Sequence, residues 1–122
     1  MFRNKHFNAM ITKFFLIVSV FGILLPPAAG ITTSTAVAAA VAVTLVSYVI
    51  ADMMIFPRYG NRIAVAADVV LALLISSEAA WVLEDAGITL VAMTLVALLI
   101  GLGEWYYHKY LARLIFKGRL KP

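Results

Sequence analysis

Apolar runs separated by short polar connections fill the chain. Four runs can be drawn, and they extend over about 10–28, 34–56, 63–83 and 88–107. A helix that crosses a membrane needs about 20 mostly apolar residues, which the last three runs supply and the first supplies only if it continues through its two prolines. Backbone groups in lipid must be hydrogen-bonded within their own segment, so these valine-rich runs predict helices rather than strands. The pattern therefore predicts an all-α membrane protein, a four-helix transmembrane bundle that forms one integral membrane domain over 1–122.

Composition strengthens this interpretation and excludes several kinds of site. Of the 122 residues, 64% are hydrophobic and 13% are charged, which is far from the composition of a soluble domain. The chain has no cysteine, so disulfides, thiolate metal sites and cysteine nucleophiles are excluded. His6 and His108 lie in the basic terminal segments, and no His/Glu grouping along the chain has metal-ligand spacing. We therefore expect no metal and no cofactor.

Enzyme chemistry has little support in the sequence. The chain contains no Ser/His/Asp grouping and no glycine-rich phosphate-binding loop. The segments outside the apolar runs are also too short to form a catalytic pocket. We expect a protein that is not an enzyme.

The distribution of basic residues predicts the orientation in the membrane. The ten lysines and arginines form three groups, at the N-terminal end of the chain, between the second and third runs, and after the fourth: Arg3, Lys5 and Lys13; Arg58 and Arg62; Lys109, Arg113, Lys117, Arg119 and Lys121. The other two connections carry only Glu84 and Asp85. The positive-inside bias then places both termini and the second connection in the cytoplasm. The net charge of +4 is thus a topology signal, and we expect no nucleic-acid partner.

The N-terminal segment has a second interpretation. A basic start, an apolar core of about 12 residues and the small residues Ala28, Ala29 and Gly30 are also the layout of a secretory signal peptide. Cleavage would leave three spans. We expect the first span to be retained, because short loops between spans are common, and the alternative stays open at this point.

Three carboxylates fall inside the apolar runs at a similar depth. Asp52 lies five residues before Pro57 and Asp68 lies six after Arg62, which places both roughly 8 Å below the cytoplasmic edge of their helices. Glu104, near the inner end of the fourth run, reaches a similar depth. A carboxylate at the centre of a spanning helix costs about 2.5–3.5 kcal/mol on insertion scales, less near an interface, and such groups persist when paired or hydrated.

Basic side chains on the connection beside these carboxylates are the natural partners. Arg58 and Arg62 can extend down from the interface, as long basic side chains do in membranes. We therefore predict an ionic lock, in which these two arginines pair with Asp52 and Asp68 and, by depth, Glu104. The alternatives are a proton or cation site and a surface that binds a partner.

Turn-forming residues mark the connection itself. Pro57 is expected to end the second helix, while Gly60 and Asn61 suit positive φ. Asn61 is also well placed as the N-cap of the third helix. Tyr48, one turn before Asp52, can donate its hydroxyl to that carboxylate.

The segment "YVIADMMIFPRYGNRIAVAADVVLALL" resembles the signature of the YndM-like family, small four-span membrane proteins of spore-forming bacilli known as domain-of-unknown-function family 2512. The positions that carry the resemblance are Tyr48, Asp52, Ile55, Pro57, Arg58, Tyr59, Gly60, Asn61, Ala64, Ala67 and Asp68. It implies a retained first span and a bacterial plasma membrane. It implies no activity, since none is established for the family.

Two further polar features lie near the membrane surfaces. Glu78, beside two serines near the outer end of the third run, is either a hydrogen-bonded or snorkelling carboxylate or the outer station of an ion path whose inner station is Asp68. Lys109, Arg113 and Lys117 recur every four residues in the basic amphipathic tail, 108–122. This row is either lipid-surface contact with an anionic inner leaflet or ordinary flanking charge.

These observations define the expected function only coarsely. We expect an accessory or structural protein of the bacterial cell membrane, multi-pass, in contact with the lipid bilayer and with a possible membrane protein partner or a second copy of itself. The alternative is a small proton or cation transporter or channel that uses the intramembrane carboxylates.

Overall fold

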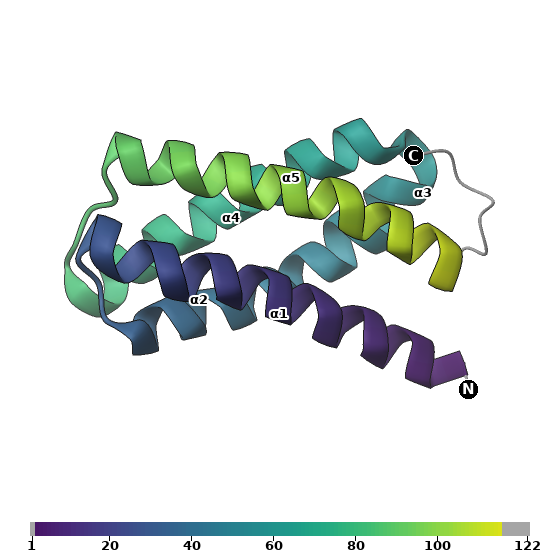
Figure 1. Cartoon of the computed structure of the whole chain (residues 1–122), viewed down its shortest axis with the longest axis horizontal. Coiled ribbons are helices and arrows are strands. Elements are labelled where there is room, and N and C mark those ends of the chain that lie inside the picture. The colour runs from purple at the N-terminus through teal and green to yellow at the C-terminus, as the bar shows by residue number, and fades with distance from the viewer. Residues whose placement is uncertain (1, 116–122) are drawn as a thin grey trace.

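The computed structural model describes residues 2–115, with side chains from Lys5 onward. Its elements are α1 (Phe2–Ala29), α2 (Thr33–Ser47), the π-helix η1 (Tyr48–Ile55), α3 (Phe56–Tyr59), α4 (Asn61–Glu84) and α5 (Leu90–Leu114). Because α2, η1 and α3 are continuous, the chain forms four long helical rods, all of them long and apolar enough to cross a membrane. They lie side by side as a bundle, and the described part of the chain contains no strand (Figure 1). The predicted fold class, an all-α four-helix bundle, is confirmed.

Both short connections at one end of the bundle are fixed by side-chain hydrogen bonds. Thr32 caps α2 and Thr89 caps α5, each accepting at its hydroxyl from a backbone N–H three residues on, at 3.2 Å. The Glu84 carboxylate, from the end of α4, accepts from the Thr32 N–H at 2.8 Å and from its hydroxyl at 2.9 Å. Asp85 ends α4 in the left-handed conformation, with φ at 51°. The two connections are therefore held to one another.

The connection at the other end, between α3 and α4, differs from the expected turn. Pro57 does not end its helix, which continues to Tyr59, and Gly60, with φ at 87°, breaks it instead. A proline ring clashes with the carbonyl four residues earlier in a regular α-helix, and the wider π-helix directly before Pro57 relieves that crowding. Asn61 is the first residue of α4, not its N-cap, and the cap position belongs to Gly60.

The interior has an apolar layer along most of the bundle and a polar layer closer to the α3 end. The apolar layer is formed by side chains from all four rods, among them Ile17, Phe21, Val43, Val96 and Ile100. A second apolar group, which includes Tyr48, Phe56, Tyr107 and Leu111, lies beyond the polar layer. Polar residues are thus sandwiched between two apolar groups inside the bundle.

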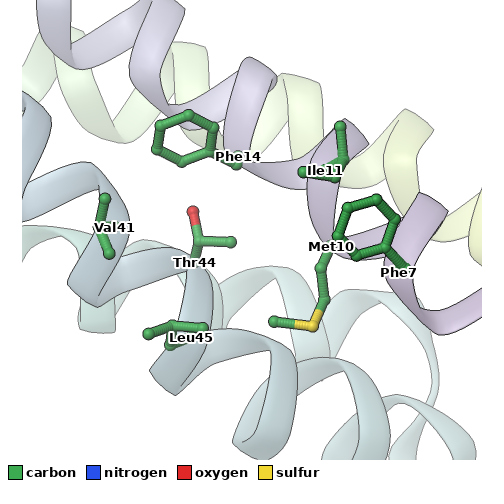
Figure 2. Close-up of a pocket in the computed structure, with 7 residues that line it drawn as sticks. All are labelled: Phe7, Met10, Ile11, Phe14, Val41, Thr44 and Leu45. Carbon is green, nitrogen blue, oxygen red and sulfur yellow. The ribbon is translucent and has the colours of Figure 1, made fainter.

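The outer surface is apolar in the way that a bilayer requires. Large aliphatic side chains point away from the bundle, and Leu98 and Val82 are 65% and 70% exposed. Between α1 and α2 the surface carries a shallow apolar groove of about 170 Å³, in which Phe7, Phe14 and Leu45 are among the lining residues (Figure 2). A protein that exposes aliphatic groups and buries charged ones has the distribution expected in lipid.

Candidate functional site: a buried charge cluster

Lys13 of α1 lies at the centre of the polar layer. Its Nζ is 2.9 Å from Asp52 Oδ2, 3.0 Å from Asp68 Oδ1 and 3.0 Å from Glu104 Oε1. The three carboxylates come from η1, α4 and α5, so one ammonium group connects all four rods. All four side chains are buried, and Lys13 has no exposed surface. The ring of Tyr107 lies beside the ammonium, with its centroid 5.0 Å from Nζ.

His108 of α5 is the second cationic group of the layer. Its Nε2 lies 2.9 Å from Asp52 Oδ1 and 3.0 Å from Asp68 Oδ2. Its Nδ1 lies 2.7 Å from Asn61 Oδ1, while Asn61 Nδ2 donates to the Trp105 carbonyl at 3.4 Å. Both ring nitrogens therefore face oxygen acceptors, an arrangement that suits the doubly protonated imidazolium. We call Lys13, Asp52, Asp68, Glu104 and His108 together the Lys13 cluster.

The charges of the Lys13 cluster do not balance. Three carboxylates against one ammonium and one imidazolium leave one excess negative charge. Every carboxylate oxygen but one has a cation within 3.0 Å; the exception is Glu104 Oε2, which is buried and has no hydrogen-bond partner among the described residues. A buried charge is tolerated when it is paired and hydrogen-bonded, so Glu104 is the least satisfied member of the cluster.

Helical spacing explains how the chain brings these groups together. Asp68 lies between Ala64 and Ala72, and this small-residue face of α4 packs inward. Glu104 and His108 are four residues apart on α5 and point the same way. On α1, Lys13 follows the same spacing between the buried Ala9 and Ile17. Each charged group therefore occupies a core position of its helix.

The structure places the predicted site residues in two groups. Asp52, Asp68 and Glu104 meet in one buried layer, at the common depth that the sequence indicates. Arg58 and Arg62 are exposed on the turn, and neither forms an ion pair with a carboxylate in the described residues. The predicted pairing with these arginines is wrong because Lys13 enters the bundle from α1 and occupies the space between the three carboxylates. The cations that pair with the carboxylates are Lys13 and His108.

Two smaller predictions of contacts also need correction. The Tyr48 hydroxyl does not bond Asp52; it lies 2.7 Å from His6 Nδ1, so it joins η1 to the start of α1. Asn61, predicted as a helix cap, uses its side chain to hold His108 instead. The Asp52 carboxylate already has Lys13 and His108 as partners, which leaves the Tyr48 hydroxyl to contact α1.

The residues near the two membrane surfaces lie outside the Lys13 cluster. Glu78 is exposed on α4, and Ser76 beside it donates its hydroxyl to the Leu73 carbonyl of the same helix at 3.3 Å. Lys109 Nζ lies 6.0 Å from the ring centroid of Trp105 and 5.7 Å from that of Tyr106, and Arg113 is exposed. Lys117 lies outside the described residues. Lipid contact by this row stays a prediction.

Sequence reasoning missed Lys13, His108 and the possibility of a metal site. Lys13 was counted with the flanking charges, although it follows Ile11 inside the apolar run. Spacing along the chain carries no sign of a metal-ligand grouping, because its members come from different rods. Four buried side chains from three rods, Asp52, Asp68, Glu104 and His108, offer ligand atoms that all lie within 4.8 Å of one another. Only the fold assembles them.

Fold and site together define an integral membrane four-helix bundle with a charged interior. The family whose description reads "Protein of unknown function (DUF2512)" matches residues 4–121, and the chain belongs to this family. The resemblance carried by the segment around Pro57 is thereby confirmed. No curated protein and no solved structure matches the chain. The match assigns no biochemical activity.

Proposed function

We propose that this protein is a non-conducting accessory or structural component of the bacterial plasma membrane, in which the Lys13 cluster holds the four helices together. One observation carries the proposal: a single ammonium group lies within 3.0 Å of carboxylates from the other three rods. Removing any rod removes a charge from the cluster. A first span cleaved as a signal peptide would take Lys13 with it, so the cluster supports retention of α1.

The interior between the cluster and the far end of the bundle supports a closed structure. That interior is filled by aliphatic and aromatic side chains such as Phe21, Val96 and Ile100. The hydroxyls of Thr44, Ser47 and Ser76 each donate to a backbone carbonyl of their own helix. Hydroxyls satisfied in this way do not form a chain of polar groups along which a proton or cation can move.

Contacts with the bilayer fit the same role. The exposed aliphatic surface and the apolar groove between α1 and α2 suit lipid acyl chains (Figure 2). The basic residues that follow the fourth run favour an anionic inner leaflet, at about 1 kcal/mol for each one near the surface. The charge distribution along the sequence supports an orientation with both termini and the α3 end in the cytoplasm.

Transport of a proton or cation is the second candidate. The excess negative charge of the Lys13 cluster and the unpaired Glu104 Oε2 favour it, since both attract a cation. It also requires a path to the outer surface, and Glu78, the residue suggested for the outer station, is exposed on the outside of α4 rather than buried in the interior. The accessory role agrees with the exposed position of Glu78, because a structural cluster needs no path to the outer surface.

Flux measurements separate the two roles. In liposomes that contain the full chain, with a pH gradient and a membrane potential imposed, we expect no proton or monovalent-cation flux above that of empty liposomes. The physical reason is the apolar layer beyond the cluster, which offers no hydrated path. Correct insertion is verified by protease protection. Flux in the wild type that Asp52→Asn and Asp68→Asn abolish, and that the exposed control Glu78→Gln keeps, would establish transport and overturn the proposal.

A further inference from the structure

We propose that the Lys13 cluster is also a binding site for one divalent transition-metal ion, with Asp52, Asp68, Glu104 and His108 as ligands. In this state the metal takes the central position that the Lys13 ammonium occupies in the structure described above. The inference goes beyond the structural role and does not depend on it. It rests on the geometry of the four side chains, on an unpartnered oxygen and on the orientation of His108.

The distances fit a metal ion after a small contraction. The candidate ligand atoms of the four side chains lie within 4.8 Å of one another. Each of the three carboxylates has an oxygen within 3.0 Å of Lys13 Nζ, and His108 Nε2 lies against the other oxygens of Asp52 and Asp68. Nitrogen and oxygen ligands bind such ions at about 2.0–2.2 Å, so ligands on opposite sides of an ion lie about 4 Å apart. Each carboxylate oxygen that now contacts Nζ therefore has to move inward by only about 1 Å, once the ammonium has withdrawn.

Glu104 supplies the independent sign of a ligand. Its side chain is fully buried, one oxygen contacts Lys13, and Oε2 has no partner among the described residues. An unpaired carboxylate oxygen in a buried site is costly and needs an explanation. A metal ion bound by Glu104 supplies the missing partner.

Asn61 holds His108 in the orientation that a metal ligand needs. Asn61 Oδ1 accepts from Nδ1 at 2.7 Å, which directs Nε2 toward Asp52 and Asp68. Ligating histidines characteristically donate their other ring N–H to an oxygen, which fixes the tautomer and the ring orientation. Stacking on Phe56, with ring centroids 4.7 Å apart, further restricts the imidazole.

Charge balance changes favourably when the ion binds. The metal adds two positive charges, and His108 releases its Nε2 proton to bind through that nitrogen. Lys13 keeps its charge and remains beside the site. Three carboxylates are then matched by one ammonium and one divalent ion, so the excess negative charge disappears and one proton is released for each ion bound.

The donor set selects the class of metal. Carboxylates suit Mn²⁺ and Mg²⁺, whereas imidazole suits Fe²⁺, Zn²⁺ and other later transition ions. Mg²⁺ usually keeps several waters, for which a fully buried cluster has little room. The combination of three carboxylates and one imidazole therefore favours a first-row transition ion such as Mn²⁺, Fe²⁺ or Zn²⁺.

Titration of the full chain with Mn²⁺ tests the assignment. The protein is purified in detergent, treated with a chelator, and titrated while free Mn²⁺ is followed by electron paramagnetic resonance. We expect one bound ion per chain and at least about tenfold weaker binding in Glu104→Gln, with a loss of about 10–100-fold in Asn61→Ala. Glu78→Gln, which removes an exposed carboxylate outside the cluster, is the control and should bind as the wild type does.

A second variant gives a result that a purely structural cluster, which binds no metal, would not produce. Lys13→Met removes the competing ammonium, so Mn²⁺ should bind more tightly and raise the melting temperature of this variant more than that of the wild type. Absence of binding in the wild type together with no thermal shift in Lys13→Met would overturn the proposal. Binding that is equally strong in the wild type and in Glu104→Gln would also overturn it, because the ion would then be held elsewhere.

Discussion

Lys13→Met is expected to lower the free energy of unfolding by about 3–5 kcal/mol in a metal-free sample, the usual cost of removing one partner from a buried ion pair. The variant keeps the length of an apolar side chain but removes the one group that contacts all three carboxylates. Asp52, Asp68 and Glu104 would then repel one another in a site of low dielectric, with only His108 to offset them. Unfolding in a graded mixture of mild and denaturing detergents measures the effect.

The matched control for this experiment is Arg62→Met. Arg62 is a basic residue close to the same layer in sequence but exposed on the first turn of α4. Surface substitutions of this kind usually change stability by less than about 0.5 kcal/mol. Equal effects of the two substitutions would contradict the assignment of Lys13 as the central cation.

The carboxylates of the Lys13 cluster are not expected to be equivalent. Asp52 has one oxygen on Lys13 and the other on His108, so Asp52→Asn should cost about 1.5–3 kcal/mol, the range of hydrogen bonds to charged groups. Glu104 has one oxygen on Lys13 and one without a partner. Glu104→Gln keeps an acceptor for Lys13 and removes the excess negative charge, so it should leave stability unchanged within about 0.5 kcal/mol or increase it.

Both variants are measured in the same detergent series, in metal-free buffer, with Glu78→Gln as the exposed control. The chain has no cysteine, so oxidation does not complicate the comparison. A larger loss of stability in Glu104→Gln than in Asp52→Asn would contradict this reading of the geometry, because it would mean that Glu104 Oε2 has a partner in the folded protein.

The helices were predictable because a bilayer imposes a strict length and polarity on each span. Lengths of apolar sequence gave four helices, and Gly60 was correctly singled out as a residue suited to positive φ. The path near Pro57 was not predictable, since the usual effect of proline is to end a helix. Here eight residues of π-helix before it absorb the steric conflict, and the sequence carries no clear signal for such a helix.

The charged interior was predictable in part. The depth of Asp52, Asp68 and Glu104 follows from counting residues to the helix ends, and small neighbours such as Ala64 indicate which way Asp68 faces. The identity of the cation was not predictable from proximity in sequence. Lys13 is 55 residues away from Asp68 and 91 from Glu104, and only helix packing brings it between them.

The burial of His108 was also not predicted from the sequence. As part of the basic tail it was expected near the membrane surface, yet it is fully buried one turn beyond Glu104. Its spacing of four residues from Glu104 was the available signal, because the two side chains must share a face of α5. Charge counting assigns a residue to a side of the membrane but says nothing about the direction of its side chain.

The measurement that tests the central claim most directly is a pair of double-mutant cycles on unfolding free energy. One cycle combines Lys13→Met with Asp68→Asn, and the other combines Arg62→Met with Asp68→Asn. If Lys13 is the cation that holds the carboxylates together, the first cycle gives a coupling of about 0.5–3 kcal/mol and the second stays within about 0.5 kcal/mol of zero. Coupling of Asp68 to Arg62, and none to Lys13, would contradict the account.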